Sequence, residues 1–525
     1  MAYYRSGTQK PLEAGNGIDI ADETISLKQM STSQFGGAKI DGTSISVNAN
    51  GQIKKLKTQT VTLSANTSEI TAGSTDVITA TASAGGTLSV SSSDSSVATA
   101  SVSNGEVTIT GVGEGNCVIT VTASATGDYG VGTATIDTTV TAVSIYGAEW
   151  DGSSSPAWTR TDGAVGFADP NPYYSGMSGT PSSPFDNIMP WSGMRIVEDA
   201  NAGTLIEIPK FYYKLNYYNP TNETGLKIQI SDKYFEGSSI SPAHLDRGDG
   251  IGERDYVYIG RYHCAYDNSS TYSYKSKSGL RASYNEDCFD TYCTKIHNLG
   301  SYIWLNDYAI CMTIWLLYLV EFAHWDSQLK IGYGCGNYQQ YGGTDQMGYT
   351  DSMPYHTGIS ATSRSAYKEG TQYRYIEGLW DNILDYVAGA VRGGSNQVYV
   401  SLNPSTFNSA IDNKYCIGYL PTVNTSTQQL LTAWKISNSS NMPWVLYPYS
   451  VINNSDYTTY ICNRYMSTTT DMYNVVLCRG GTNSMRNSRE AGMFYLYFSD
   501  TGSNYGGKGA RLMVLPPSRL SPPEP

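Results

Sequence analysis

"RGGTNSMRNSREAGMFYLYFSDTGSNYGGKGARL" (residues 479–512) is the stretch that decides how the C-terminal part of the chain folds. Gly480 and Gly481 permit a tight turn or a positive φ angle. The next segment, MFYLYF (493–498), alternates so that Met and two Tyr share one side while Phe, Leu and Phe share the other. This alternation predicts a strand with one buried and one displayed face. We therefore expect a stiff β frame that carries the polar run between the glycines and the strand.

The end of the stretch supplies a further frame residue. Arg511 is the only charge in GARLMVL (509–515), so we expect it to pair with a carboxylate, either Asp381 or Asp385. Both carboxylates lie in GLWDNILDYV (378–387), where the apolar spacing predicts a helix over about 376–387. A second helix is predicted over about 302–326, with a wide apolar face that implies burial on more than one side.

Length and composition limit the protein class. A chain of 525 residues predicts three or four folded units. Its 53 Gly and 43 Tyr with only 15% charged residues favour turn-rich β structure that uses tyrosine on the surface. The net charge of −12 argues against a nucleic-acid partner.

Targeting and redox features are sparse. The N-terminus lacks a basic segment followed by an apolar core, so we expect no secretory signal. The apolar run 309–320 is shorter than the ~20 residues of a membrane span, so we expect a buried helix and no membrane insertion. Nine cysteines without a CxxC pair predict reduced thiols in a protein made in a cytoplasm.

The chain divides into four parts by composition. Residues 1–57 hold short alternating strands with Asn-Gly or Gly-Gly turns, such as AGNGIDI (14–20), and too little apolar content for a monomeric core. Residues 58–142 become rich in Thr, Ser and Val with regular turns, which predicts an all-β sandwich. Residues 143–517 are rich in Tyr and Trp and are expected to form an α+β domain, and residues 518–525 are a Pro-rich tail.

Two of these parts resemble known families. SSVATA (95–100) followed by GEVTITGVGEG (105–115) resembles the bacterial Ig-like group 2 family, whose modules act as spacers or sometimes bind sugar. The first part resembles the short β segments of trimeric phage tail fibres. These resemblances imply an N-terminal stalk that attaches to phage tail or baseplate proteins and forms a homotrimer, followed by an Ig-like spacer.

The C-terminal part resembles the formylglycine-generating sulfatase-modifying family in three phrases that occur in the same order. They are GLWDNILDYV (378–387), RGGTNS (479–484) and GARL (509–512). The resemblance implies a C-type-lectin-like fold, which also carries the variable proteins of diversity-generating retroelements. YGAEWDG (146–152) and PFDNIMPW (184–191) are similar to phage and prophage tail proteins. Together they imply a virion protein made in the host cytoplasm.

A dense group of Tyr, Asn, Ser, Thr and Arg side chains is the candidate binding face. Tyrosine gives contact area at low entropic cost, and small polar residues give adaptable hydrogen bonds, as in antibody paratopes. These are also residues that adenine-directed mutagenesis of asparagine codons produces. The predicted ligand-binding residues are Tyr457, Tyr460, Asn463, Arg464, Tyr465, Tyr473, Asn474, Thr482, Asn483, Ser484, Arg486, Asn487 and Arg489. Their expected ligand is a bacterial cell-surface receptor, either protein or glycan.

Other functions have weaker support in the sequence. Cys462 and Cys478 are not embedded in the phrases that resemble the oxidising enzymes, and no histidine lies in an HExxH motif, so no catalytic residue or cofactor is expected. The segment DRGDGIG (246–252) is predicted to be a polar turn, with a partial calcium loop or an RGD integrin ligand as the alternatives. A bacterial or prophage-encoded adhesin and a sulfatase-modifying oxidase remain the alternative functions.

Overall fold

The computed structural model describes residues 4–5, 8–11, 25–26, 45–47, 52–265, 274–283, 287–334, 346–364, 370–421, 429–453, 464–467, 475–480, 492–499 and 507–521. The chain forms two compact units. Unit 1 comprises Met1–Val143 and Tyr234–Glu236, and unit 2 comprises Ser144–Lys233 and Gly237–Pro525. Of the residues that the structure describes, 43% are in strands and 10% are helical, so the protein is a multidomain, mainly β chain, as expected. The four-part division stays a prediction.

The N-terminal residues of unit 1 form short strands. Strands β1 (Tyr4–Arg5) and β2 (Thr8–Pro11) pair in antiparallel fashion. A three-stranded antiparallel sheet has the order β3-β5-β4, with β3 at Ile25–Ser26, β4 at Ile45–Val47 and β5 at Gln52–Lys55. The predicted trimer and its attachment role stay predictions.

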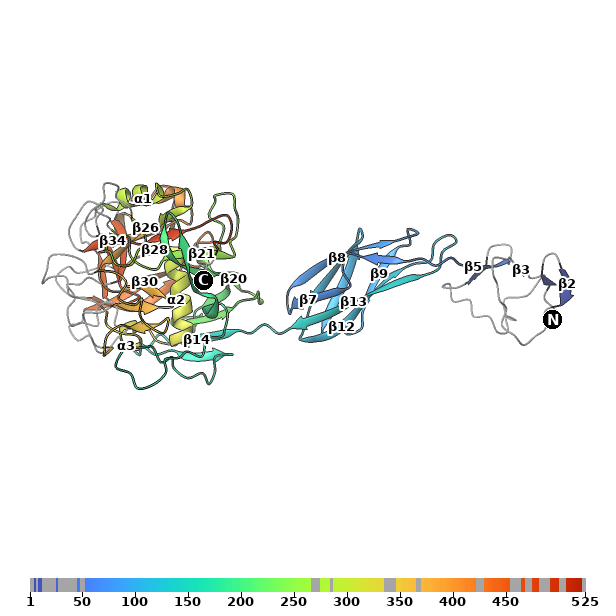
Figure 1. Cartoon of the computed structure of the whole chain (residues 1–525), viewed down its shortest axis with the longest axis horizontal. Helices are drawn as coiled ribbons and strands as arrows, with labels where there is room; N and C mark the ends of the chain where they lie inside the picture. The colour runs from blue at the N-terminus through green and yellow to red at the C-terminus, as the bar shows by residue number, and fades with distance from the viewer. Residues whose placement is uncertain are drawn as a thin grey trace. The chain divides into compact units, whose positions relative to one another are not determined.

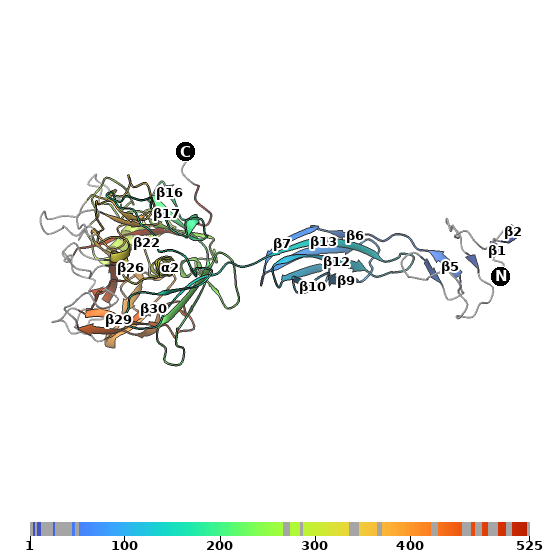
Figure 2. The ribbon, with the colours of Figure 1, turned by 90° about the horizontal axis from the view of Figure 1, so that it is seen from below.

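The rest of unit 1 is a sandwich of two four-stranded sheets (Figure 2). One sheet has the order β10-β11-β8-β6 and the other β7-β13-β12-β9. The strands are β6 (Val61–Leu63), β7 (Thr67–Thr71), β8 (Thr75–Ala82), β9 (Leu88–Ser92), β10 (Ala98–Ser103), β11 (Glu106–Gly111), β12 (Gly115–Ala123) and β13 (Gly132–Thr141).

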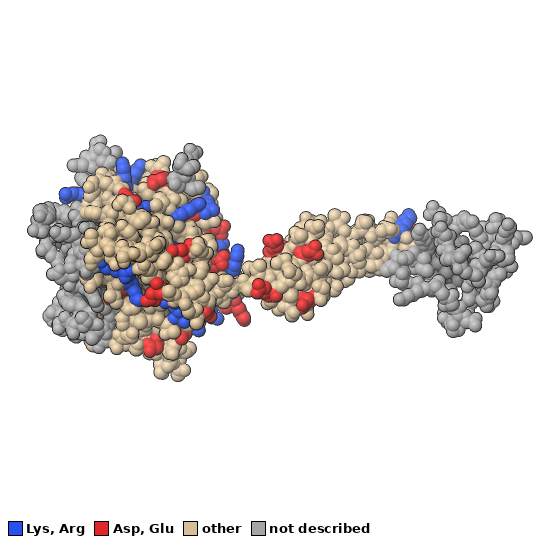
Figure 3. Space-filling model, turned by 60° about the horizontal axis from the view of Figure 1, so that its bottom comes forward, with Lys and Arg blue, Asp and Glu red and all other residues tan. Residues whose placement is uncertain are grey.

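Alternating β-branched residues fill the space between these two sheets. Val107, Ile109, Ile119, Val121 and Ile136 are fully buried, while their neighbours along the strands are more exposed, which is the period-2 pattern of a half-buried strand. The charged residues over most of this sandwich are all acidic: residues 58–143 contain seven Asp and Glu but no Lys or Arg. Figure 3 shows acidic side chains on one half of the visible face of the sandwich.

Unit 2 contains two five-stranded sheets. The first has the order β15-β14-β19-β18-β20 and the second β16-β17-β21-β35-β22. Their strands are β14 (Tyr146–Trp150), β15 (Thr159–Asp162), β16 (Arg195–Asp199), β17 (Gly203–Pro209), β18 (Tyr212–Asn216), β19 (Leu226–Ser231), β20 (Ser239–Ile240), β21 (Tyr256–Gly260), β22 (Ile303–Leu305) and β35 (Leu512–Val514).

A three-stranded and a nine-stranded sheet complete unit 2. The small sheet has the order β23-β24-β25, and the large one has the order β28-β27-β26-β32-β33-β31-β29-β30 with β34 paired to β26. Their strands are β23 (Gly358–Ile359), β24 (Thr371–Tyr373), β25 (Ile376–Glu377), β26 (Leu384–Arg392), β27 (Gln397–Val400), β28 (Tyr415–Tyr419), β29 (Gln429–Ile436), β30 (Leu446–Asn453), β31 (Arg464–Ser467), β32 (Val475–Gly480), β33 (Leu496–Ser499) and β34 (Lys508–Ala510).

Helices of unit 2 lie among these sheets (Figure 1). The α-helices in the described residues are α1 (Phe289–His297), α2 (Tyr308–Phe322) and α3 (Ser327–Lys330). The short 3-10 helices are η1 (Trp191–Gly193), η2 (Pro242–His244), η4 (Gly394–Asn396) and η5 (Pro404–Thr406).

Helix α2 is the centre of the core of unit 2. Asp307 caps it by accepting a hydrogen bond from the Ile310 N–H, and Ala323 ends it at a φ of 47°. Every residue of α2 is buried, which confirms the predicted burial on more than one side. The predicted start at residue 302 is wrong, because Ile303–Leu305 pairs with β35 and is drawn into a sheet. No helix in the described part of the chain is long and apolar enough to span a membrane.

The helix predicted over 376–387 does not form. Residues 376–377 belong to β25 and residues 384–392 to β26, and the turn between them contains Gly378 at a φ of 70° and Asn382 at 64°. The apolar spacing was misleading because all nine residues of β26 are buried, so apolar residues occur on both faces of this strand. A strand buried on both sides has no period-2 pattern to distinguish it from a helix.

Candidate functional site

The structure describes only two of the predicted binding residues. Arg464 and Tyr465 lie in β31, where Arg464 pairs with Leu430 of β29 and Tyr465 pairs with both Gln429 and Leu496. The others lie outside the described residues: Tyr457, Tyr460, Asn463, Tyr473, Asn474, Thr482, Asn483, Ser484, Arg486, Asn487 and Arg489. The proposal that they form a binding face therefore rests on the strands to which they are joined.

Strand β32 fixes where two of these groups join the sheet. Its first residue, Val475, pairs with Arg392 at one end of β26, and its last, Gly480, pairs with Leu384 at the other end. Six strand residues span about 17 Å at roughly 3.3 Å per residue. Tyr473 and Asn474 therefore precede one end of β32, while the residues from Thr482 onward follow the opposite end.

The Gly480 end is a meeting point of several strands. Leu384 pairs with both Gly480 and Lys508, and Arg479 pairs with Leu496. The described chain stops at Gly480, the last residue of β32, and resumes at Gly492, shortly before β33, the antiparallel neighbour of β32. This hairpin arrangement supports the expected division into a frame and the residues between its strands.

Arg511 fastens that frame from inside. It is fully buried, and its Nε donates to Asp385 Oδ2 at 3.1 Å, which confirms one of the two expected partners. Its Nη1 donates to the carbonyl oxygens of Gly260 and Arg261, and its Nη2 donates to those of Glu377 and Gly378. One guanidinium therefore joins the end of β21, the turn before β26, and β26 itself.

Asp385 is shared by three groups. His263 Nδ1 lies 2.8 Å from Asp385 Oδ1, and the buried Arg479 lies 3.8 Å from Oδ2. Burial acts to raise the pKa of Asp385, but His263 and Arg511 hold that pKa well below its usual range. Burial also lowers the pKa of His263. The Asp385 carboxylate opposes this shift, while the charge of Arg511 adds to it. We infer an ionised carboxylate that compensates two buried guanidinium groups.

A second buried carboxylate braces the same turn. Asp381 Oδ2 accepts hydrogen bonds from the backbone N–H and the hydroxyl of Thr371, at 2.7 and 2.8 Å. Burial raises the pKa of Asp381 to about 7, the Thr371 hydrogen bonds oppose this rise, and the nearby Glu377 adds to it. Gly378 is required beside it, because a Cβ there would lie 2.7 Å from His263 Nε2 and 2.8 Å from Asp381 Oδ1.

Gly480 confirms the expected positive φ, at 94°. The predicted displayed face of 493–498 is wrong in part, since the strand begins only at Leu496 and both Met493 and Tyr495 are buried. Trp315 of α2 donates its indole N–H to the Met493 carbonyl oxygen at 3.0 Å. This contact holds the residues before β33 against the core, so only Tyr497 on that side stays partly exposed.

An aromatic cluster gives the frame its stiffness. Trp325 stacks on Trp434 of β29 at 5.7 Å between ring centroids, and Phe494 meets Trp325 edge-on at 4.9 Å. Trp315 also meets Trp434 edge-on at 5.5 Å. Each aromatic pair adds about 0.5–1.5 kcal/mol beyond the burial of its area. The strands beside the predicted face are therefore anchored on α2 and the segment that follows it.

Sequence reasoning missed a tyrosine surface on the same sheet. We call it the tyrosine seam, and it comprises Tyr399, Tyr419, Tyr447 and Tyr449. Strands β28 and β30 stand at opposite ends of the sheet order, yet a Cβ on Gly418 would lie 2.4 Å from the ring of Tyr447. The sheet is therefore curved enough that its two edge strands touch.

The seam displays its rings beside polar groups. Tyr419 and Tyr449 are 59% and 50% exposed. The Tyr399 hydroxyl donates to Gln397 Oε1 at 3.1 Å, and Gln397 Nε2 donates to the Tyr419 hydroxyl at 3.4 Å.

A cation completes the seam on the β30 side. Lys435 Nζ lies 4.2 Å above the Tyr449 ring and 2.9 Å from Glu223 Oε2. The repeated tyrosines of YCIGY (415–419) and YPYS (447–450) were the available sequence indication. The contact between these two strands could not be predicted from the sequence, because it depends on the curvature of the whole sheet.

The alternative sites receive little support in the described residues. Arg247 of the RGD tripeptide is buried and forms an ion pair with Asp307, while Asp249 pairs with Arg254. Asp246 accepts a hydrogen bond from the Gly248 N–H, which is the expected polar turn. Among the described residues, no three His, Cys, Asp or Glu side chains gather as a metal site.

Cysteine chemistry is equally limited in what the structure describes. The free thiols there include Cys117, Cys264, Cys288, Cys293, Cys311 and Cys416. Cys462, one member of the pair considered for oxidase chemistry, lies outside the described residues, and Cys478 is buried in β32.

Comparison with known proteins adds no relative. No protein-family model matches this chain, and no curated protein sequence matches it.

Proposed function

We propose that this chain is the receptor-binding protein of a phage tail fibre and binds a bacterial cell-surface receptor through unit 2. The observation that carries the proposal is the tyrosine seam, in which two rings that are at least half exposed stand on a curved, anchored sheet. Exposed tyrosines on stiff strands are typical of binding surfaces, because they give large contact area for little lost entropy.

The sequence resemblances add the biological setting. The phrases that resemble the sulfatase-modifying family fall on frame positions, since Asp385 and Arg511 form the buried ion pair and Arg479 lies beside it. A C-type-lectin-like unit of this kind would hold its frame while residues 481–491 vary. The sandwich of unit 1 would be the Ig-like spacer, and residues 1–57 would attach the fibre to the tail.

A trimer would strengthen weak single contacts. Three receptor-binding units on one fibre convert the second and third contacts into intramolecular events. Avidity gains of about 10²–10⁴-fold are common when the geometry allows simultaneous binding. We expect the isolated contact to be weak and adsorption of the virion to be strong.

Adsorption to cells tests the binding proposal. The full-length chain carries a fluorescent label and is mixed with a panel of bacterial strains, and cell-bound fluorescence is measured. We expect the double variant Tyr419→Ser and Tyr449→Ser to lose adsorption to the strains that bind the parent chain. Tyr174→Ser is the matched control, because Arg364 lies over the Tyr174 ring as Lys435 lies over that of Tyr449.

Two results would count against the proposal. If the seam variant and the control adsorb equally well, the seam does not take part in receptor binding. A lack of adsorption to every strain would oppose the receptor-binding function itself. Retroelement diversification has a separate test in the neighbouring DNA, where a near-copy of the 3′ end that differs only at adenines should lie beside a reverse transcriptase gene.

A further inference from the structure

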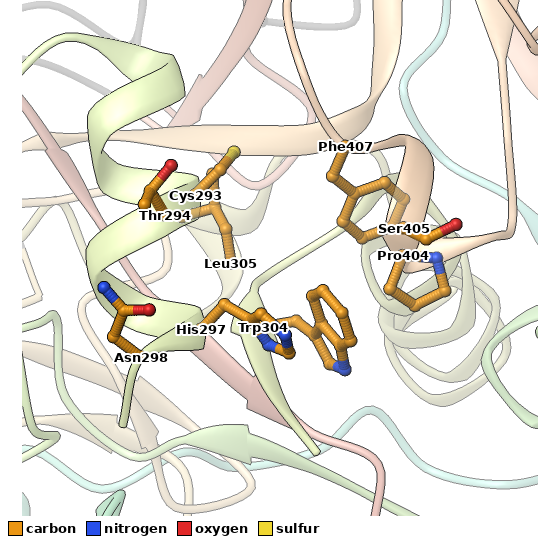
Figure 4. Close-up of a pocket in the computed structure, with 9 residues that line it drawn as sticks. All are labelled: Cys293, Thr294, His297, Asn298, Trp304, Leu305, Pro404, Ser405 and Phe407. Carbon is orange, nitrogen blue, oxygen red and sulfur yellow. The ribbon is translucent and has the colours of Figure 1, made fainter. Parts of the chain in front are cut away.

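A preformed pocket lies in unit 2, and none of its lining residues belongs to the tyrosine seam. It has a volume of about 350 Å³ and opens between α1, β22 and the segment around η5 (Figure 4). This volume is within the range of small-molecule sites, which starts near 300 Å³. The pocket volume thus suits a ligand with one or two rings.

One wall of the pocket is aromatic and apolar. Trp304 is half-buried and stacks on His297 with ring centroids 3.7 Å apart and planes 14° from parallel. Figure 4 shows the indole extending from β22 toward Pro404, with Phe407 nearby. Leu305 is buried next to it in the chain. An indole held by stacking on a second ring is a fixed platform for the apolar face of a ligand.

Polar groups stand around this platform. His297 Nδ1 lies 3.1 Å from the carbonyl oxygen of Ile303, which can only accept, so Nδ1 is the donor in this hydrogen bond. The indole N–H of Trp304 and the side-chain amide of Asn298 have no hydrogen-bond partner among the described residues. Asn298 and Ser405 are exposed at the rim. Donors and acceptors therefore flank an aromatic floor.

The lining of the pocket lacks acidic and basic side chains that would bind an ionic ligand. None of the nine lining residues is Asp, Glu, Lys or Arg. Burial raises the pKa of the Cys293 thiol, so that group stays protonated and neutral. An anion or cation entering this pocket would lose hydration without gaining a partner of opposite charge. The ligand is expected to be neutral.

We propose that this pocket binds a neutral pyranose, either a free sugar or the terminal residue of a glycan. A pyranose combines an apolar C–H face, which suits the indole, with hydroxyl groups at its edges, which suit His297, Asn298 and Ser405. A wholly apolar ligand would leave the Trp304 N–H and the His297 Nε2 unpaired. The pocket is separate from the seam, so it does not require the proposed receptor binding.

Saturation-transfer NMR on the full-length chain tests the proposal. The probes are the methyl glycosides of glucose, galactose, mannose and N-acetylglucosamine at millimolar concentration. We expect transfer to the ring C–H protons of at least one probe, with a dissociation constant on the order of 1 mM, as suits a small ligand in an open pocket. Trp304→Ala should weaken that binding about tenfold, because the platform is lost.

A second variant tests the pocket in case Trp304→Ala fails to fold. Ser405 is exposed, so Ser405→Trp fills the pocket without touching the core and should abolish transfer. Ser154→Trp, at an exposed loop position, is the matched control and should leave transfer unchanged. The proposal is overturned if none of the four probes shows transfer, or if transfer persists in Ser405→Trp. Cell adsorption can fail while transfer persists, so this result is independent of the proposed function.

Discussion

The buried carboxylate of Asp381 makes the stability of unit 2 depend on pH. Burial raises its pKa to about 7 in the folded state from an ordinary value of 3.8, against the hydrogen bonds from Thr371. Between these two values the folded chain holds a proton that the unfolded chain releases. Stability from this group is therefore complete below about pH 4 and is lost as the pH rises through about 7.

The size of the effect follows from the two pKa values. A shift of roughly three units at 1.36 kcal/mol per unit gives an upper limit of about 4 kcal/mol, of which about 2.5 kcal/mol should be lost between about pH 5 and about pH 8. Asp381→Asn keeps an oxygen that can accept both Thr371 hydrogen bonds and has no proton to release. The variant should therefore lack this part of the pH dependence.

Urea denaturation at the two pH values measures the difference. Tryptophan fluorescence reports unit 2 alone, because all nine Trp lie at or after residue 150. Asp255→Asn, at an exposed carboxylate, is the control for a general effect of charge. Comparing parent and variant removes the contribution of the titrating groups that do not interact with Asp381. Equal pH dependence in the parent chain and Asp381→Asn would refute the reasoning.

Three further substitutions test the frame and the spacer. Asp385→Ala should cost about 3–5 kcal/mol, because it leaves the guanidinium groups of Arg511 and Arg479 buried without compensation; a small change in the thermal midpoint would contradict this. Gly480→Ala should cost about 1–3 kcal/mol in urea, since the φ of 94° strains any residue with a Cβ, and an unchanged midpoint would oppose it. Ile119→Ala should destabilise the sandwich by about 2–5 kcal/mol, measured by circular dichroism. The unfolding transition seen by tryptophan fluorescence should stay in place. A shift of both transitions would contradict independent unfolding of the sandwich and unit 2.

Local patterns predicted much of the frame. The Thr-, Ser- and Val-rich composition with regular turns predicted β structure over 58–142, where strands such as β8, β11 and β12 each have one apolar face between the sheets. The single charge in an apolar strand correctly indicated a buried partner for Arg511, which is Asp385. These features depend on nearest neighbours along the chain or on the cost of burying an unpaired charge, so sequence alone carries them.

Other features depend on contacts that no local pattern records. Strands β7 and β13 are rich in Thr, and their few apolar positions give only a weak local pattern. Burial of Met493 and Tyr495 results from the position of α2, and the tyrosine seam results from the curvature of a sheet of nine strands. The predicted binding face depends on residues that the structure does not describe.

The absence of basic side chains from most of the sandwich has a consequence for digestion. Trypsin cuts after Lys and Arg, and between Lys57 and Arg160 the chain offers it neither. Even after complete denaturation, a tryptic digest should release residues 58–160 as a single long peptide. A protein that meets this protease would keep its middle section whole, whatever happens to the parts on either side.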